Sequence, residues 1–137
     1  MPFLTSALYF ENAVGKLYEQ ADKYAYVQYK PGKRALPDLQ VFLTQLAQLL
    51  QRRAWYKMLT DQRQMAQFTQ EERLWIRDTW LTGPQAVSHK VLAAVLLPED
   101  VFARLSMKLV MNETQEGMLV YHIFGNEQEA ATWLRRI

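Results

Sequence analysis

The stretch VLAAVLL, from Val91 to Leu97, decides the fold class of this chain. Every residue in it is apolar, so a strand formed here must be covered on both of its faces. A strand buried in this way is typical of the middle of a parallel sheet that is flanked by helices. We therefore expect an α/β fold in which the strands nearest to this segment run parallel.

Helix and strand signals alternate on the carboxyl side of this stretch. Pro98-Glu99-Asp100 opens a helix, and its apolar spacing predicts an inner face formed by Val101, Phe102, Leu105 and Leu109. Met118 to Phe124 is the last predicted strand. Asn126 and Glu129 have capping-box spacing and open the final helix, with Ala130, Trp133, Leu134 and Ile137 expected on its inner face.

The alternation continues on the amino side. Trp55 to Thr60 is a predicted strand that ends at Asp61, and Thr69 and Glu72 form a capping box that opens a helix ending at Gly83. Apolar residues at three- and four-residue spacing predict a longer helix from Pro37 to Arg53.

The first third of the chain favours strands. The short aromatic or alternating segments are 7–12, 16–20 and 24–29, and the turns between them are brief. Short connections predict an antiparallel meander. The expected fold is thus a mixed sheet, with N-terminal antiparallel strands followed by repeated β-α units and about four helices, in one domain over residues 1–137.

Composition excludes several kinds of chemistry. The chain has no cysteine, which removes disulfides, thiolate metal sites and cysteine nucleophiles. Its net charge of +2 does not predict nucleic-acid binding, and its five glycines never have the spacing of a phosphate-binding loop. We predict no cofactor, no metal site and no catalytic residue.

The sequence also predicts a cytoplasmic protein without a membrane span. Residues Met1 to Phe10 contain no basic residue and no long apolar core, so they do not have the pattern of a signal peptide. The longest apolar run, Val91 to Leu97, is far shorter than the roughly 20 residues that a spanning helix requires.

The strongest candidate for a binding site follows the strand that ends at Asp61. Asp61, Gln62 and Arg63 should lie at the carboxyl edge of the parallel strands, where ligands bind in open α/β sheets. Two interpretations of Asp61 stay open: it binds a ligand or partner, or its carboxylate caps the turn through backbone amides. Trp80, off the apolar stripe of its helix, either lines a pocket or partner surface or packs at the helix end.

Three motifs resemble the SpoIIAA-like family, relatives of the STAS domains of anti-sigma-factor antagonists. Trp55 to Arg63 looks like that family's strand ending in Asp with a following Arg, and Val91 to Pro98 is similar to its buried strand. Tyr121 to Phe124, followed by Glu129 to Leu134, resembles its C-terminal strand and Glu-Ala-x-x-Trp-Leu helix. The resemblance implies a STAS-like fold and, at Thr69, the hydroxyl that corresponds to the family's phosphorylated position.

Three functions are compatible with these patterns. The first is a non-enzymatic, STAS-like regulatory module that docks on a protein partner near Asp61 to Thr69 and the helix that follows, with Thr69 as a phosphorylation site. The second is a carrier for a small apolar, lipid-like ligand, suggested by the many aromatic residues and methionines. The third is an enzyme of unrecognised type that would bring Asp61, Arg63 and His89 together. An exposed edge of the N-terminal meander also makes a homodimer conceivable.

Overall fold

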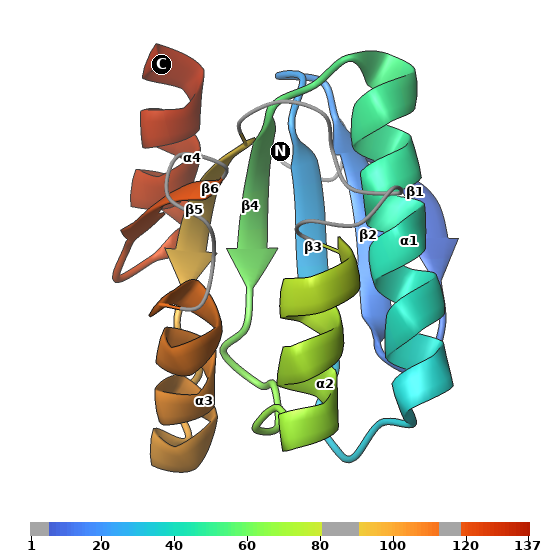
Figure 1. The fold of residues 1–137 in the computed structure, drawn as a ribbon. Coiled ribbons are helices and arrows are strands. Elements are labelled where there is room, and N and C mark those ends of the chain that lie inside the picture. The colour runs from blue at the N-terminus through green and yellow to red at the C-terminus, as the bar shows by residue number, and fades with distance from the viewer. Residues whose placement is uncertain (1–5, 81–90, 113–118) are drawn as a thin grey trace.

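The computed structural model describes residues 6–80, 91–112 and 119–137. Within these ranges the chain forms an α/β fold with a six-stranded mixed sheet and four helices (Figure 1). The six strands lie side by side in the order in which they occur along the chain. The predicted α/β class and mixed sheet are confirmed.

The antiparallel part of the sheet is the N-terminal meander. It consists of β1 (Ser6–Glu11), β2 (Gly15–Gln20) and β3 (Ala25–Tyr29), paired in that order. Aromatic and β-branched residues favour these strands, and the connections between them are too short for a parallel crossover. Strand β1 forms one edge of the sheet, as predicted.

The parallel part begins at β3 and continues through β4 (Lys57–Asp61), β5 (Val91–Leu96) and β6 (Leu119–Ile123). Strand β5 has a neighbour on each side, and Ala93 and Ala94, which point to opposite faces, are both buried. The stretch that is apolar throughout is therefore an interior strand covered on both faces, as expected.

The helices divide unequally between the two faces. Helices α1 (Leu36–Arg53), α2 (Gln70–Trp75) and α3 (Val101–Asn112) cover one face, and α4 (Glu127–Arg136) lies on the other (Figure 1). Helix α2 continues into a π-helical turn, η2 (Ile76–Trp80), and the predicted end at Gly83 lies outside the described residues. The larger core lies between the sheet and α1 to α3, and a smaller one lies beneath α4.

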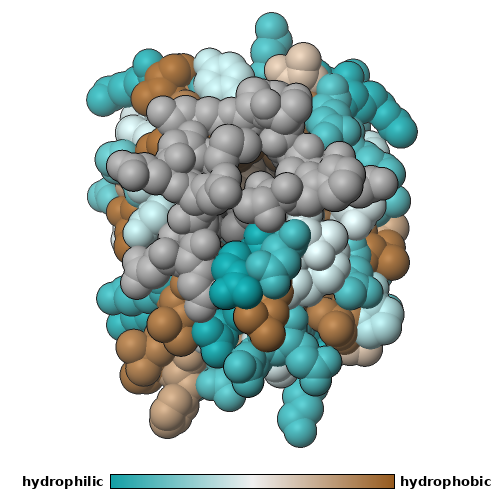
Figure 2. Space-filling model, in the orientation of Figure 1, coloured by the Kyte–Doolittle hydropathy of each residue, from teal (hydrophilic) through white to brown (hydrophobic). Residues whose placement is uncertain are grey.

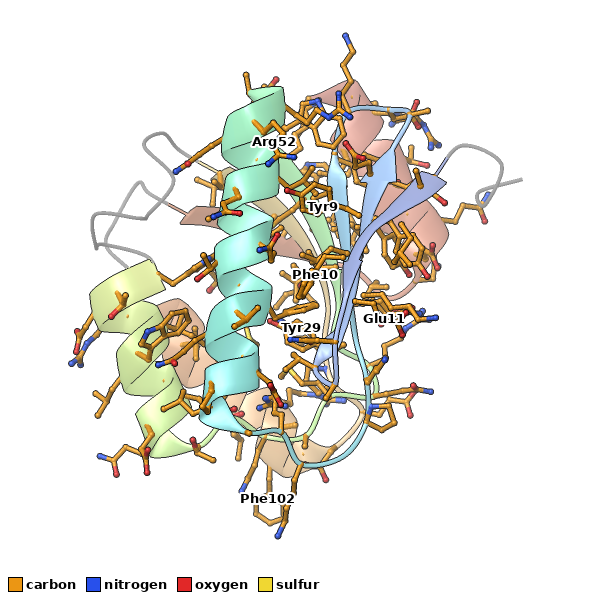
Figure 3. The ribbon with its side chains drawn as sticks, turned by 90° about the vertical axis from the view of Figure 1, so that its right-hand side faces the viewer. Tyr9, Phe10, Glu11, Tyr29, Arg52 and Phe102 are labelled. Carbon is orange, nitrogen blue, oxygen red and sulfur yellow. The ribbon has the colours of Figure 1, made fainter. Side chains whose placement is uncertain are left out.

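A β-bulge adapts β1 to the helix above it. The pairing of β1 with β2 shifts between Leu8 and Phe10, so Tyr9 and Phe10 both face α1 (Figure 3). Phe10 packs against the core, while the Arg52 guanidinium lies 5.9 Å from the centre of the Tyr9 ring. The edge strand thus contributes two consecutive aromatic side chains to one face.

The predicted inner face of α3 is wrong. Val101, Phe102, Leu105 and Leu109 are exposed, and the buried residues are Ala103, Ser106, Met107 and Val110. Helix α3 is apolar on two opposite sides, and Ser106 belongs to the inner side because its hydroxyl donates to the Ala103 carbonyl and accepts from the Phe68 amide. The inner face predicted for the last helix is wrong at Ile137 alone, which is exposed just beyond the end of α4.

No helix in the described ranges combines the length and the apolarity needed to cross a membrane.

Candidate functional site

A small cavity lies between the sheet and the three helices that cover it; we call it the helix-side cavity. Its volume is about 50 Å³, counted as the space that the centre of a water-sized sphere can occupy. All four parallel strands contribute to its wall, together with α1, η2 and α3. The described residues that line it are Val27, Tyr29, Leu43, Leu46, Met58, Thr60, Gln62, Phe68, Ile76, Trp80, Ala93, Val95, Met107, Val110 and Tyr121.

Two polar side chains in this apolar wall have no hydrogen-bond partner at their oxygens among the described residues. Thr60 is 6% exposed and Gln62 is 2% exposed, and neither Thr60 Oγ1 nor Gln62 Oε1 is paired. Thr60 points to the helix side because it lies in register with Val27 and Val95 on the neighbouring strands. An unpaired buried acceptor costs about 1–3 kcal/mol, so both atoms mark a place where a hydrogen-bonding molecule is favoured.

Trp80 lines the same cavity from the end of η2. Its indole Nε1 donates to the Leu43 carbonyl of α1 at 2.6 Å, which fixes the ring across the gap between the two helices. Both of the interpretations offered for Trp80 therefore apply to its position: the ring packs at the end of its helix, and it lines a cavity.

Asp61 faces away from that cavity, toward the α4 side of the sheet. The carboxylate accepts two hydrogen bonds from the Arg63 guanidinium, at 2.9 and 2.8 Å, and one from the Arg63 backbone amide at 3.2 Å. The Tyr26 hydroxyl donates to it at 3.3 Å. Asp61 thus does cap its turn, as one of its two interpretations stated, and it also forms an ion pair in which its own carboxylate is buried and the Arg63 side chain is partly exposed.

This cluster borders an open, polar hollow at the carboxyl edge of the parallel strands, which we call the edge cleft. Its volume is about 320 Å³, and the described residues that line it are Gln28, Tyr29, Asp61, Arg63, Gln64 and Glu99. The predicted edge position of Asp61 and Arg63 is therefore correct, whereas Gln62 turns into the helix-side cavity.

The two titratable acids of this cluster are both shifted away from neutral pH. Burial disfavours the Asp61 carboxylate, but hydrogen bonds from Arg63 outweigh burial and hold the pKa of Asp61 below its ordinary value. Burial and the nearby Asp61 charge raise the pKa of the Tyr26 hydroxyl. General acid–base catalysis needs a pKa near the working pH, so these two pKa shifts favour a structural role for the cluster.

Thr69 caps α2 and is exposed. Its hydroxyl accepts from the Glu72 amide at 3.1 Å, and its own amide donates to the Glu72 carboxylate at 2.8 Å, which completes the predicted capping box. Glu72 also forms a bidentate ion pair with Arg34, in which both side chains are almost fully buried. A phosphate on Thr69 would therefore lie beside a carboxylate that is already held in place.

The outer side of α3 carries a set of exposed apolar residues that sequence reasoning assigned to the core. We call Val101, Phe102, Leu105 and Leu109 the outer stripe; Phe102 is 68% exposed and Leu105 is 55% exposed. In Figure 2 hydrophobic surface gathers at the lower left, where Figure 1 places α3. Figure 3 shows Phe102 projecting from the lower end of the molecule.

Two further polar side chains, His122 and Ser106, have structural contacts. The His122 ring packs against Trp133 with the ring centres 4.7 Å apart, and the Ser106 hydroxyl donates to the Ala103 carbonyl and accepts from the Phe68 amide. His89, the third member of the enzyme hypothesis, lies outside the described residues. Within the described ranges no group of His, Asp or Glu side chains is arranged to hold a metal ion.

Sequence reasoning missed Thr60 and the outer stripe. Thr60 had a detectable signal, because it is a polar residue at an inward position of a strand flanked by apolar ones. The orientation of α3 had a weaker signal, because both of its sides carry apolar residues but Arg104 and Lys108 lie on the side of the outer stripe.

No family model matches this chain, and neither does a curated protein or a solved structure. The resemblance to STAS-like domains stays a prediction that rests on three short motifs and on the order of the elements.

Proposed function

We propose that this chain is a non-enzymatic, STAS-like interaction module that docks on a protein partner through the outer stripe of α3. The observation that carries the proposal is the grouping of four large apolar side chains on one exposed side of a single helix. Single exposed apolar residues are common on protein surfaces, but a contiguous set on one element is typical of an interaction site.

The shape and charge of the stripe define the partner. A helix on the outside of the molecule is convex, and the anchors Val101, Leu105 and Leu109 recur once per turn, so they fit an apolar groove. Arg104 and Lys108 are the exposed cations of α3, and no acidic residue occurs between Val101 and Asn112. The partner we propose therefore has an apolar groove with carboxylates along one rim.

The segment from Asp61 to Thr69 lies next to α3. The Glu99 amide donates to the Arg63 carbonyl at 3.1 Å, and the Phe68 amide donates to Ser106 of α3 at 2.9 Å. These contacts place the segment that carries Arg63 and Thr69 beside α3, and phosphorylation of Thr69 would add charge next to that helix.

Site-specific photocrosslinking in the expressing cell tests this function. A photoreactive residue replaces Leu105, and a matched control replaces Leu8, which has the same side chain, is 53% exposed and lies on β1. We expect an adduct of defined protein mass at position 105 and not at position 8, and we expect Arg104→Glu with Lys108→Glu to remove it. An adduct of lipid mass, an adduct of this chain with itself, or the same adducts at both positions would overturn the proposal.

A second function, binding of a small apolar ligand, is supported by the helix-side cavity. The centre of a water-sized sphere has about 50 Å³ of this cavity open to it, which is space for a small organic molecule. The ligand we propose is therefore a small molecule and not an acyl chain. A native mass spectrum of the purified protein should show a retained mass excess, and a cavity occupied only by water contradicts this function.

A further inference from the structure

The two unpaired oxygens in the helix-side cavity restrict what can occupy it. Gln62 Oε1 only accepts hydrogen bonds, so its partner must donate an O–H or an N–H. The Thr60 hydroxyl both donates and accepts, so it can complete the bonding of the same polar group. Both residues line the same cavity, so a ligand with a donor–acceptor head offers a partner to each of them.

The rest of the wall is apolar and uncharged. Met58 and Ala93 from the sheet and Met107 from α3 are buried against the cavity, and no Lys, Arg, Asp or Glu is among its described lining residues. A carboxylate would meet an acceptor at Gln62 and no cation, and a charge would lose its hydration without a partner. The occupant is therefore neutral.

The Tyr29 phenol, which also lines the cavity, adds no charge to its wall. Burial raises the pKa of Tyr29 to about 12, so the Tyr29 side chain stays neutral across the physiological range. The charged pair nearest to the wall, Arg34 and Glu72, is satisfied internally by its bidentate contact and by the carbonyls of Ala66 and Gln67.

Water satisfies only part of the site. One water molecule can bridge Thr60 and Gln62, but further waters would find apolar side chains, and a buried water needs two to four polar partners. A molecule with a polar head and a short apolar body satisfies both parts of the wall.

We propose that the helix-side cavity binds a small neutral amphiphile, of the class of short alcohols or primary amides. Its O–H or N–H donates to Gln62 Oε1 and pairs with the Thr60 hydroxyl, while its carbon body packs against Met58, Ala93 and Met107. This inference rests on the second of the two functions proposed above and is independent of docking through α3.

Three probes with the same number of non-hydrogen atoms test the chemical class: propan-2-ol, acetone and acetate. Propan-2-ol donates a hydrogen bond, acetone only accepts, and acetate is charged. Each is titrated through the millimolar range into protein labelled with carbon-13 at the methionine methyl groups. Met58 and Met107 report on the cavity, and Met65, which is buried but does not line it, is the control.

We expect propan-2-ol to shift the signals of Met58 and Met107 with saturation, and to leave that of Met65 unchanged. Acetone should bind at least tenfold more weakly, and acetate should cause no saturable shift. Gln62→Leu removes the acceptor that only propan-2-ol can satisfy, so it should reduce the preference for propan-2-ol over acetone. Ala93→Val narrows the cavity and should weaken the binding of both probes.

Two results would overturn the inference, and they can be told apart. Equal binding of propan-2-ol and acetone to the wild type overturns the proposed chemical class but leaves ligand binding in place. No saturable shift with any probe, nor with dissolved xenon as a purely apolar probe, overturns ligand binding in the cavity altogether. The backbone amide spectrum of each variant shows whether it retains the fold.

Discussion

Helices α1 and α3 have similar apolar spacing and opposite outcomes. Helix α1 lies in the same layer of helices as α3, and it buries its apolar stripe, including Leu39, Phe42 and Leu46, in the core. Helix α3 turns its large apolar residues outward and buries Ala103 and Ser106 with Met107 and Val110. Spacing identifies a stripe in both helices, but it does not say what covers the stripe.

The difference lies in the opposite side of each helix. Behind the stripe of α1 the residues are mostly polar, so only one orientation buries apolar surface. Behind the outer stripe of α3 lie Ala103, Met107 and Val110, which also form an apolar side. Small residues allow the helix to approach its neighbours closely, and the hydrogen bond from the Phe68 amide to Ser106 fixes which side faces in.

The largest expected effect separates the two stripes directly. Leu46→Ala removes a fully buried side chain from α1 and should lower the free energy of unfolding by about 2–5 kcal/mol. Leu105→Ala removes the same atoms from the outer stripe and should change it by no more than about 0.5 kcal/mol. Urea unfolding of both variants and the wild type measures the two values. A large cost at Leu105 would mean that the outer stripe is covered.

The next effect tests how closely α3 is seated. Ala103 is fully buried, so Ala103→Leu forces extra volume beneath the helix and should cost about 1–3 kcal/mol of the free energy of unfolding. Lys108→Leu adds an apolar side chain at an exposed position of the same helix and should stay within about 0.5 kcal/mol. Thermal unfolding, followed by circular dichroism, compares the two variants. Equal losses would contradict the orientation of α3.

The features that could be predicted from the sequence are those set by local patterns. Local patterns predicted the order of helices and strands along the chain, the burial of β5 and the capping box at Thr69. The structure confirms these three features. Asp61 and Arg63 were placed at the correct edge because parallel strands end together. These features depend on neighbours in sequence or on a general rule of sheets.

The remaining features depend on contacts between distant segments. Gln62 enters the helix-side cavity and Asp61 does not, because adjacent residues of an extended chain point to opposite sides. The bidentate pair of Arg34 and Glu72 joins residues that are far apart along the chain, and no local pattern connects them. The orientation of α3 depends on Ser106 meeting Phe68, which spacing alone does not reveal.

A smaller effect comes from α2, which contacts both α1 and α3. Thr69→Ala removes the hydroxyl that accepts from the Glu72 amide and should cost about 0.5–2 kcal/mol of the free energy of unfolding. Thr69→Ser keeps the acceptor and should remain close to the wild type. Chemical denaturation distinguishes the two, and an equal loss in both variants would show that the threonine methyl group, not the cap, is responsible.

The smallest expected effect on stability comes from removing exposed apolar side chains, the feature on which docking through α3 depends. Phe102→Ser on α3 and Val41→Ser on α1 each remove one exposed apolar side chain, so both should leave the free energy of unfolding within about 0.5 kcal/mol of the wild type. Their surfaces differ, because Phe102 belongs to a contiguous stripe of four large apolar residues, whereas Val41 is the one large apolar side chain that α1 exposes within the described residues.

Retention on a phenyl column therefore separates the two variants where stability does not. Phe102→Ser should shorten the retention of the folded protein clearly more than Val41→Ser does, since a contiguous patch binds an apolar matrix through several side chains at once. Equal retention of the two variants would mean that the outer stripe does not act as one surface, and the argument for docking through α3 would then lose its basis even if the helix is oriented as described.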